Sequence, residues 1–160
     1  MFYENRIDVA RSGSVVGGDY WTATIVHSGN QSMPFYYNNA VGKSEATFTL
    51  TSNHDWTIKG LNTLTIWFRG NANNPAETMY VVLNGSAAVN HDNPNATQVD
   101  IWMEWRISLR EFYIQGVNLA NVNSITLGFG NRDNPQPGGS GLVYFDDIRL
   151  YRRPESDPEL

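Results

Sequence analysis

Hydrophobic and polar residues alternate along most of this 160-residue chain, and this period of two constrains its fold more than any other feature. The clearest stretch runs from Gln98 to Leu109, QVDIWMEWRISL. Successive side chains of a strand point to opposite faces, so its apolar positions share one face while its charged residues and Trp102 share the other. The pattern predicts a long strand that places Met103, Trp105 and Ile107 in a hydrophobic core.

Eight further stretches have a similar pattern, and together they predict about nine or ten short strands separated by turns. They are Asn5–Val9, Trp21–His27, Ser32–Asn38, Glu45–Thr51, Leu61–Arg69, Thr78–Asn84, Val122–Gly130 and Val143–Tyr151. Asn84-Gly85 is a hairpin signal because both residues tolerate positive φ. A single helical turn is expected within Arg110–Gly116. We therefore predict an all-β fold, a two-sheet antiparallel β-sandwich of the jelly-roll type. Its core is expected to include Ile66, Phe68, Ile148 and Leu150.

The last strand-like stretch, VYFDDIRLY, contains two adjacent acids. Strict alternation places Asp146 on the same face as Ile148 and Leu150, and Asp147 on the opposite face. An ionised carboxylate among apolar side chains is unfavourable unless a cation or several hydrogen bonds compensate it. A bound metal ion would compensate Asp146. Alternatively, this face is solvated and the two aspartates only mark the end of a strand.

The composition excludes several classes of function. Charged residues make up 17% of the chain, the formal net charge is -5, and the sequence has no cysteine. An acidic chain without clusters of Lys and Arg is unsuited to binding nucleic acid. No apolar run approaches the length of a membrane span. We expect one domain, residues 1–151, followed at 152–160 by a charged, proline-containing tail or linker to neighbouring domains.

Two segments in this order carry a family resemblance: HSGNQSMPFYYNN at His27–Asn39 and FDDIRLY at Phe145–Tyr151. They resemble the carbohydrate-binding jelly rolls of the galactose-binding-like superfamily, such as families 4, 6, 22 and 35 of the carbohydrate-binding modules. They also resemble a version of this module found in large secreted bacterial proteins. The resemblance implies a polysaccharide partner and an extracellular or cell-surface location.

The same resemblance implies a structural calcium ion between the two ends of the chain. Asp146 would supply a carboxylate, and the turn that contains Ser28 and Gln31 would supply backbone carbonyl oxygens. An acid from the first strand usually completes such a site, and Glu4 is the candidate, with Asp8 and Asp147 as weaker substitutes. Calcium prefers six to eight oxygen ligands of these kinds.

Sugar binding requires flat aromatic surfaces flanked by hydrogen-bonding groups. Trp67 and Trp102 point outward in their predicted strands, although loops covering that face remain an alternative. The other predicted ligand-binding residues are Arg69, Asp100 and Glu104 beside the tryptophans, Tyr80 as a possible neighbour, and Tyr37 after the His27–Gln31 turn.

An enzyme is not expected. The chain has no HExxH or GxSxG motif. Asp100 and Glu104 would be about 13 Å apart along one strand, too far for the carboxylate pair of a glycosidase, which needs about 5 to 9.5 Å. We predict a non-catalytic module that binds a polysaccharide. The alternatives are a structural or adhesion spacer of a multidomain secreted protein and, less favoured, a jelly-roll enzyme that degrades glycans.

Overall fold

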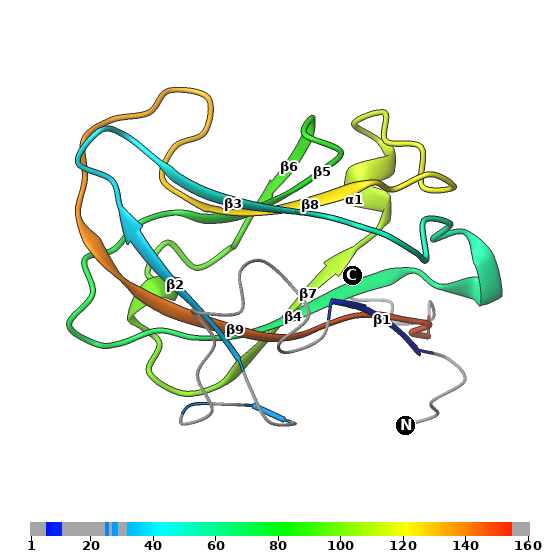
Figure 1. The fold of residues 1–160 in the computed structure, drawn as a ribbon, viewed down its shortest axis with the longest axis horizontal. Coiled ribbons are helices and arrows are strands. Elements are labelled where there is room, and N and C mark those ends of the chain that lie inside the picture. The colour runs from blue at the N-terminus through cyan, green and yellow to red at the C-terminus, as the bar shows by residue number, and fades with distance from the viewer. Residues whose placement is uncertain (1–5, 11–24, 26, 29–31, 155–160) are drawn as a thin grey trace.

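The computed structural model describes residues 6–10, 25, 27–28 and 32–154, and for residues 6–10 only the backbone. Two antiparallel sheets pack face to face, which confirms the predicted β-sandwich (Figure 1). Sheet 1 has the strand order β1-β9-β4-β7, and β2 also pairs with β9. Its strands are β1 Arg6–Ala10, β2 Met33–Asn38, β4 Thr63–Arg69, β7 Met103–Ser108 and β9 Ser140–Tyr151. Sheet 2 has the order β3-β8-β5-β6, with β3 Ser44–Thr49, β5 Met79–Leu83, β6 Ala87–Asn90 and β8 Ser124–Phe129.

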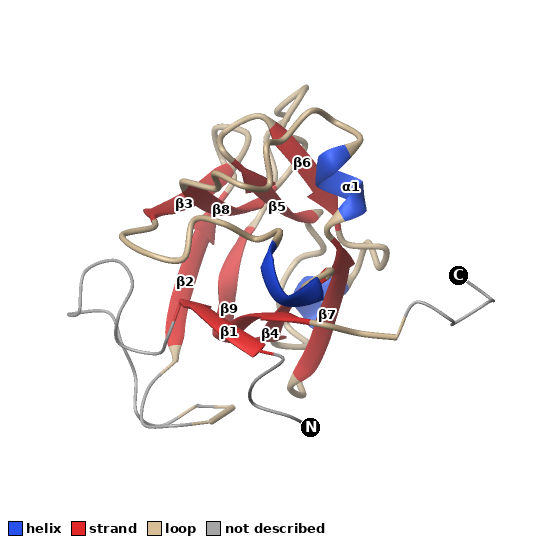
Figure 2. Ribbon diagram, turned by 90° about the vertical axis from the view of Figure 1, so that its right-hand side faces the viewer, coloured by secondary structure: helices blue, strands red, loops and turns tan. Residues whose placement is uncertain are grey.

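Helical structure is confined to short pieces in the described part of the chain. The helix α1, Arg110–Tyr113, confirms the expected helical turn and lies beside β6 at the edge of the sandwich (Figure 2). Two 3-10 turns occur at Ile58–Gly60 and Ala96–Gln98. Among the described residues, no helix has the length and apolar character needed to cross a membrane. The predicted strand Trp21–His27 lies mostly outside the described residues.

The core between the sheets contains most of the residues predicted for it. The buried ones are Ile66, Phe68, Trp105, Ile107, Ile148 and Leu150. Aromatic rings fill its centre: Phe35 meets Phe129 edge-on with ring centroids 5.0 Å apart, and Tyr37 stacks on Phe129 at 4.6 Å. The Asn84-Gly85 hairpin is also confirmed, since both residues have positive φ and Leu83 pairs with Ala87.

The predicted strand Gln98–Leu109 is wrong in its first half. The strand begins only at Met103, because the preceding segment turns away and bonds to the loop after β4. The Gly70 N–H donates to the Val99 carbonyl at 2.6 Å. Ile101 and Met103 are consequently 60% and 40% exposed, so the prediction of Met103 in the core is wrong.

A β-bulge in β9 corrects the predicted position of Asp146. Asp146 lies opposite Trp67 of β4, whereas Arg149 lies opposite Thr65, so β9 contains one extra residue between the two pairs. Asp147 has a φ of 49° at this point. An extra residue reverses the facing of every side chain beyond it. Asp146 therefore shares the outer face with Trp67, while Ile148 and Leu150 point into the core.

His91 is a half-buried histidine packed against the core. Its ring packs 5.2 Å from Phe68 and 5.0 Å from Trp105, and its Nδ1 atom accepts a hydrogen bond from the Asn93 N–H at 3.0 Å. Burial lowers the pKa of His91 below its usual 6.5, although the nearby charge of Asp92 opposes this shift. A depressed histidine pKa means that the unfolded chain binds the proton at a higher pH than the folded chain.

We therefore expect the free energy of unfolding to decrease as the pH falls below about 6.5, towards the lower pKa of the folded state. Urea unfolding at about pH 7.5 and about pH 5.5 measures this loss. The His91→Phe variant keeps an aromatic ring but cannot titrate, so its loss should be smaller. An equal loss in both proteins would assign the pH dependence to other groups.

Candidate functional site

The outer face of sheet 1 carries most of the predicted binding residues. Trp67 and Arg69 project outward from β4, and their neighbours across the β4/β9 ladder are Asp146 and Tyr144, respectively. On the other side of β4, Glu104 of β7 lies opposite Trp67. Residues directly opposite each other in a ladder project from the same face. The sheet therefore gathers aromatic, cationic and acidic side chains on one surface.

A pocket of about 440 Å³ opens on this face at the end of β4. It is lined by Ile25, Arg69, Gly70, Asn71, Asn73, Asn74, Asp100, Leu142 and Tyr144. The lining combines an aromatic ring, a cation, a carboxylate and three amide side chains. This mixture offers one flat surface together with donors and acceptors, which suits a ligand rich in hydroxyl groups.

Hydrogen bonds join the loop after β4 to the segment before β7 and to β9, and they build the pocket. The buried Asn74 donates from its amide to the carbonyl oxygens of Thr97, at 2.7 Å, and Leu142, at 2.9 Å. The Gln98 amide donates in return to the Asn74 carbonyl at 2.9 Å. These bonds fix the loop after β4 against the segment before β7. Asp100 is thereby brought to the same pocket as Arg69, 31 residues earlier in the sequence.

Next to the pocket, three rings gather on the same face. The imidazole of His27 stacks on Trp67 with ring centroids 3.7 Å apart and planes 18° from parallel. Trp102 lies 5.6 Å from His27 in a tilted arrangement. His27 covers one face of the Trp67 indole, so this face is not available to a sugar ring. Trp102 is half-buried and remains the better candidate for stacking.

The two acids of the β9 bulge hold this histidine. The Asp147 carboxylate contacts His27 Nδ1 at 2.6 Å, accepts from the Ser28 hydroxyl at 2.7 Å and pairs with Arg149 at 3.1 Å. Asp146 accepts from the backbone N–H groups of His27, at 3.0 Å, and Ser28, at 3.2 Å. Several donors thus compensate both buried carboxylates, which anchor the turn to the sheet.

The described residues leave the predicted calcium site untested, because two of its four predicted ligands lie outside them. The turn donates two backbone N–H groups to Asp146, whereas a calcium ion would need its carbonyl oxygens. Burial together with the adjacent Asp147 charge raises the pKa of Asp146 despite these hydrogen bonds. In the described ranges no group of three or more His, Cys, Asp and Glu side chains is placed to hold a metal ion. The predicted ligands Gln31 and Glu4 lie outside these ranges. Calcium stays a prediction.

Two of the predicted binding residues are buried instead. Tyr37 is 1% exposed in the core, where its hydroxyl donates to the Pro75 carbonyl. Tyr80 is fully buried on sheet 2, away from the Trp67 face, and its hydroxyl donates to Glu45 at 2.7 Å. Neither ring is accessible to a ligand from solvent, so both predictions are corrected.

Glu104 stays on the predicted face, but its carboxylate is already paired. It contacts Arg106 at 2.6 Å and Arg153 at 3.1 Å. Arg153 also exchanges backbone hydrogen bonds with the Asn62 side chain. The chain therefore remains attached to sheet 1 beyond the expected domain end at Tyr151.

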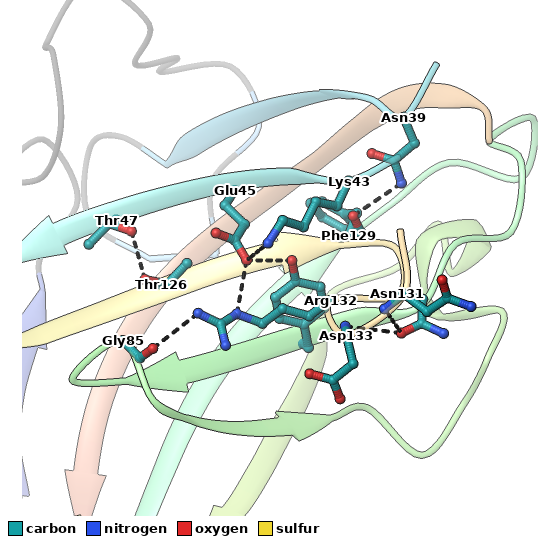
Figure 3. Close-up of polar contacts among 12 residues, drawn as sticks. Asn39, Lys43, Glu45, Thr47, Gly85, Thr126, Phe129, Asn131, Arg132 and Asp133 are labelled. Atoms are coloured by element: carbon teal, nitrogen blue, oxygen red, sulfur yellow. Dashed lines mark hydrogen bonds and ion pairs between the residues drawn. The ribbon is translucent and has the colours of Figure 1, made fainter. Parts of the chain in front are cut away.

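A second polar cluster lies on the outer face of sheet 2 (Figure 3). Glu45 accepts from Tyr80 and from Arg132, at 3.1 Å, and Lys43 lies 3.6 Å away. Burial opposes ionisation of Glu45, but these partners outweigh it and lower its pKa, while burial and the bond to Glu45 raise the pKa of Tyr80. Arg132 also donates to the Gly85 carbonyl. The charged and hydrogen-bonding groups of this cluster are therefore paired with one another.

Comparisons with solved structures place this fold. The family 11 carbohydrate-binding module from Clostridium thermocellum, in complex with a β-1,3-1,4-mixed-linked tetrasaccharide, matches 92% of this chain and 88% of its own at 14% identity and a TM-score of 0.57. The chain has the β-sandwich fold of carbohydrate-binding modules. The corresponding module of the cellulosomal cellulase Lic26A-Cel5E of the same organism matches 83% of this chain and 81% of its own, at 15% identity and a TM-score of 0.55.

Enzymes also contain this fold as a part. An exo-β-agarase matches 97% of this chain at 11% identity and a TM-score of 0.60, but the match covers only 24% of the agarase chain. No protein-family model matches the sequence, and no curated protein matches it. The two Clostridium modules belong to family 11, so families 4, 6, 22 and 35 gain no support as specific relatives.

The sequence alone does not reveal several residues of this face. Its local pattern places His27 at the end of a predicted strand and the start of a turn, and it singles out neither Tyr144 nor the three asparagines of the pocket. The Asn-rich segment RGNANN at Arg69–Asn74 is the available signal, because a cluster of Asn and Gly directly after a strand marks a polar loop at its end. No local pattern indicates that His27 stacks on Trp67.

Proposed function

We propose that this chain is a non-catalytic module that binds a polysaccharide on the outer face of sheet 1. The observation that carries this proposal is the pocket beside Trp102, where Arg69, Asp100 and Tyr144 meet the asparagines of the loop after β4. The likeness to carbohydrate-binding modules supports it at the level of the fold. Stacking on an aromatic ring, with hydrogen bonds to the flanking groups, would supply the affinity.

The pocket lining favours binding over catalysis. Asp100 is the single carboxylate among its nine lining residues. Hydrolysis of a glycosidic bond generally uses two carboxyl groups about 5 to 9.5 Å apart. Glu104, the other acid predicted for the site, is occupied by Arg106 and Arg153.

The remaining parts of the proposal concern the setting of the module. The small share of the agarase that matches this chain supports an accessory domain attached to neighbouring domains of a larger protein. An extracellular or cell-surface location would follow from a polysaccharide partner. A structural calcium ion would depend on Glu4 and Gln31, together with Asp146 and the Ser28 carbonyl.

Affinity electrophoresis and calorimetry test this function on a polysaccharide panel that includes mixed-linkage β-glucan and agarose. We expect modest binding, which Trp102→Ala weakens by about 2 kcal/mol, because truncating an aromatic anchor removes most of its stacking energy. Arg69→Ala should weaken binding by about 1.5 kcal/mol through the loss of a charged hydrogen-bond donor. The control is Tyr113→Ala, which removes an exposed aromatic ring from α1.

Other outcomes would contradict the proposal in distinct ways. A spacer would bind no member of the panel. An enzyme would release reducing ends or unsaturated products. Binding that survives both substitutions but is lost in Arg132→Ala would move the site to the outer face of sheet 2.

A further inference from the structure

Three separate contacts hold His27 in one position. Its ring is stacked on Trp67, its Nδ1 atom lies 2.6 Å from Asp147, and its backbone N–H is bound by Asp146. Asp147 adopts a φ of 49°, a conformation that residues other than glycine rarely adopt. Unusual backbone conformations and buried acids that orient a histidine are features of sites where a side chain has to be held in one position.

The hydrogen bond to Asp147 determines what the opposite edge of the ring offers. An ionised carboxylate can only accept, so the contact with Asp147 assigns a ring hydrogen to Nδ1, and in that tautomer Nε2 is the nitrogen that accepts. Among the described residues, Nε2 has no hydrogen-bond partner, and 25% of the His27 side chain is exposed. The free edge therefore presents an acceptor on the face that carries Trp102 and the pocket.

We propose that His27 is a ligand-contacting residue, which accepts a hydrogen bond from a glycan hydroxyl through Nε2, and that the glycan is neutral. This inference rests on the proposed function and adds the class of ligand. Asp147 is then a positioning residue, because it acts on the ligand only through His27.

The charges near His27 favour a neutral ligand. Asp146 and the ion pair of Asp147 with Arg149 lie directly behind the histidine, and Asp100 lines the pocket. Arg69 is the single cation among the nine lining residues, and Asp100 balances it. A carboxylate or sulfate group has no hydrogen to donate to the Nε2 acceptor and would lie near Asp146, whereas a hydroxyl can donate to it.

Two matched variants separate ligand contact from a structural role. An asparagine amide reaches the position of Nδ1 and a glutamine amide reaches that of Nε2, and both replacements remove the ring equally. His27→Asn keeps a donor for Asp147 but loses the acceptor, so binding should weaken about tenfold, as for one lost hydrogen bond. His27→Gln keeps the acceptor, so it should bind more tightly than His27→Asn even though its melting temperature is lower.

The reverse order of affinities, with His27→Asn binding better than His27→Gln, would show a structural role and overturn the inference. Binding by His27→Asn equal to wild type would also overturn it, while the proposed function would stand if Arg69→Ala and Trp102→Ala still lost affinity. A wild-type protein that binds no glycan would overturn both. Affinity for the preferred glycan should not change between about 0.05 M and about 0.5 M salt, and a steep decrease would show an acidic ligand instead.

Discussion

The Gly70→Ala variant should lose about 3 kcal/mol of unfolding free energy and should no longer bind glycan. Gly70 directly follows β4, and its N–H donates to the Val99 carbonyl. A Cβ atom at this position would overlap the Thr97 carbonyl oxygen and lie 2.6 Å from the Thr97 carbonyl carbon. Both are backbone atoms that Asn74 holds in place, so the two loops would have to separate, and the pocket would open.

Urea unfolding measures this loss, and Gly116→Ala is its control. Gly116 has a φ of 98°, and no atom lies within 4 Å of the place that an alanine methyl group would take. Alanine there introduces backbone strain of about 1 kcal/mol without a clash. A Gly70→Ala protein as stable as Gly116→Ala would show that the loops separate easily. The proposed rigid pocket would then be wrong.

The Asp147→Ala variant should lose about 3 kcal/mol of stability. Asp147 is 6% exposed, and its removal leaves the Ser28 hydroxyl and His27 Nδ1 without their acceptor. Arg149 also loses a partner, but this arginine is partly exposed, so its share is small. Alanine adds strain because it does not favour a φ of 49°.

Two further substitutions divide this loss into its parts. Asp147→Gly removes the same carboxylate but tolerates the positive φ, so it should be about 1 kcal/mol more stable than Asp147→Ala. Asp147→Asn keeps an acceptor oxygen for Ser28 and also tolerates the backbone, so its loss should be the smallest. Thermal and urea unfolding of the three variants test this order. Wild-type stability in Asp147→Ala would show that the acid does not anchor the turn.

The class of fold and most of the core follow from the sequence alone. Alternation is a property of the extended backbone, so the apolar face of each strand is readable without knowing its neighbours. The alternation correctly predicts the burial of Ile66, Phe68, Trp105 and Ile107. The Asn84-Gly85 turn was also predictable, because positive φ is a local preference of these two residues.

The points at which the alternation stops depend instead on pairing between strands and loops. The bulge at Asp146 and Asp147 is set by the pairing of β9 with β4, and it moved Asp146 to the outer face. The segment before Met103 left the sheet because Val99 bonds to Gly70. The bulge and the late start of β7 both depend on partners distant in sequence, which the alternation within one strand cannot indicate.

Which outward side chains can contact a ligand also depends on the folded chain. The alternation along a strand indicates which face of the sheet a residue is on. Other segments of the chain determine whether that face is covered. Tyr80 points outward from β5 but is fully buried, and its hydroxyl is bound to Glu45. Arg69 and Asp100 line one pocket because Asn74 joins the segments that carry them. The burial of Tyr80 and the closeness of Arg69 to Asp100 both come from contacts between segments distant in sequence, and these contacts exist only once the chain has folded.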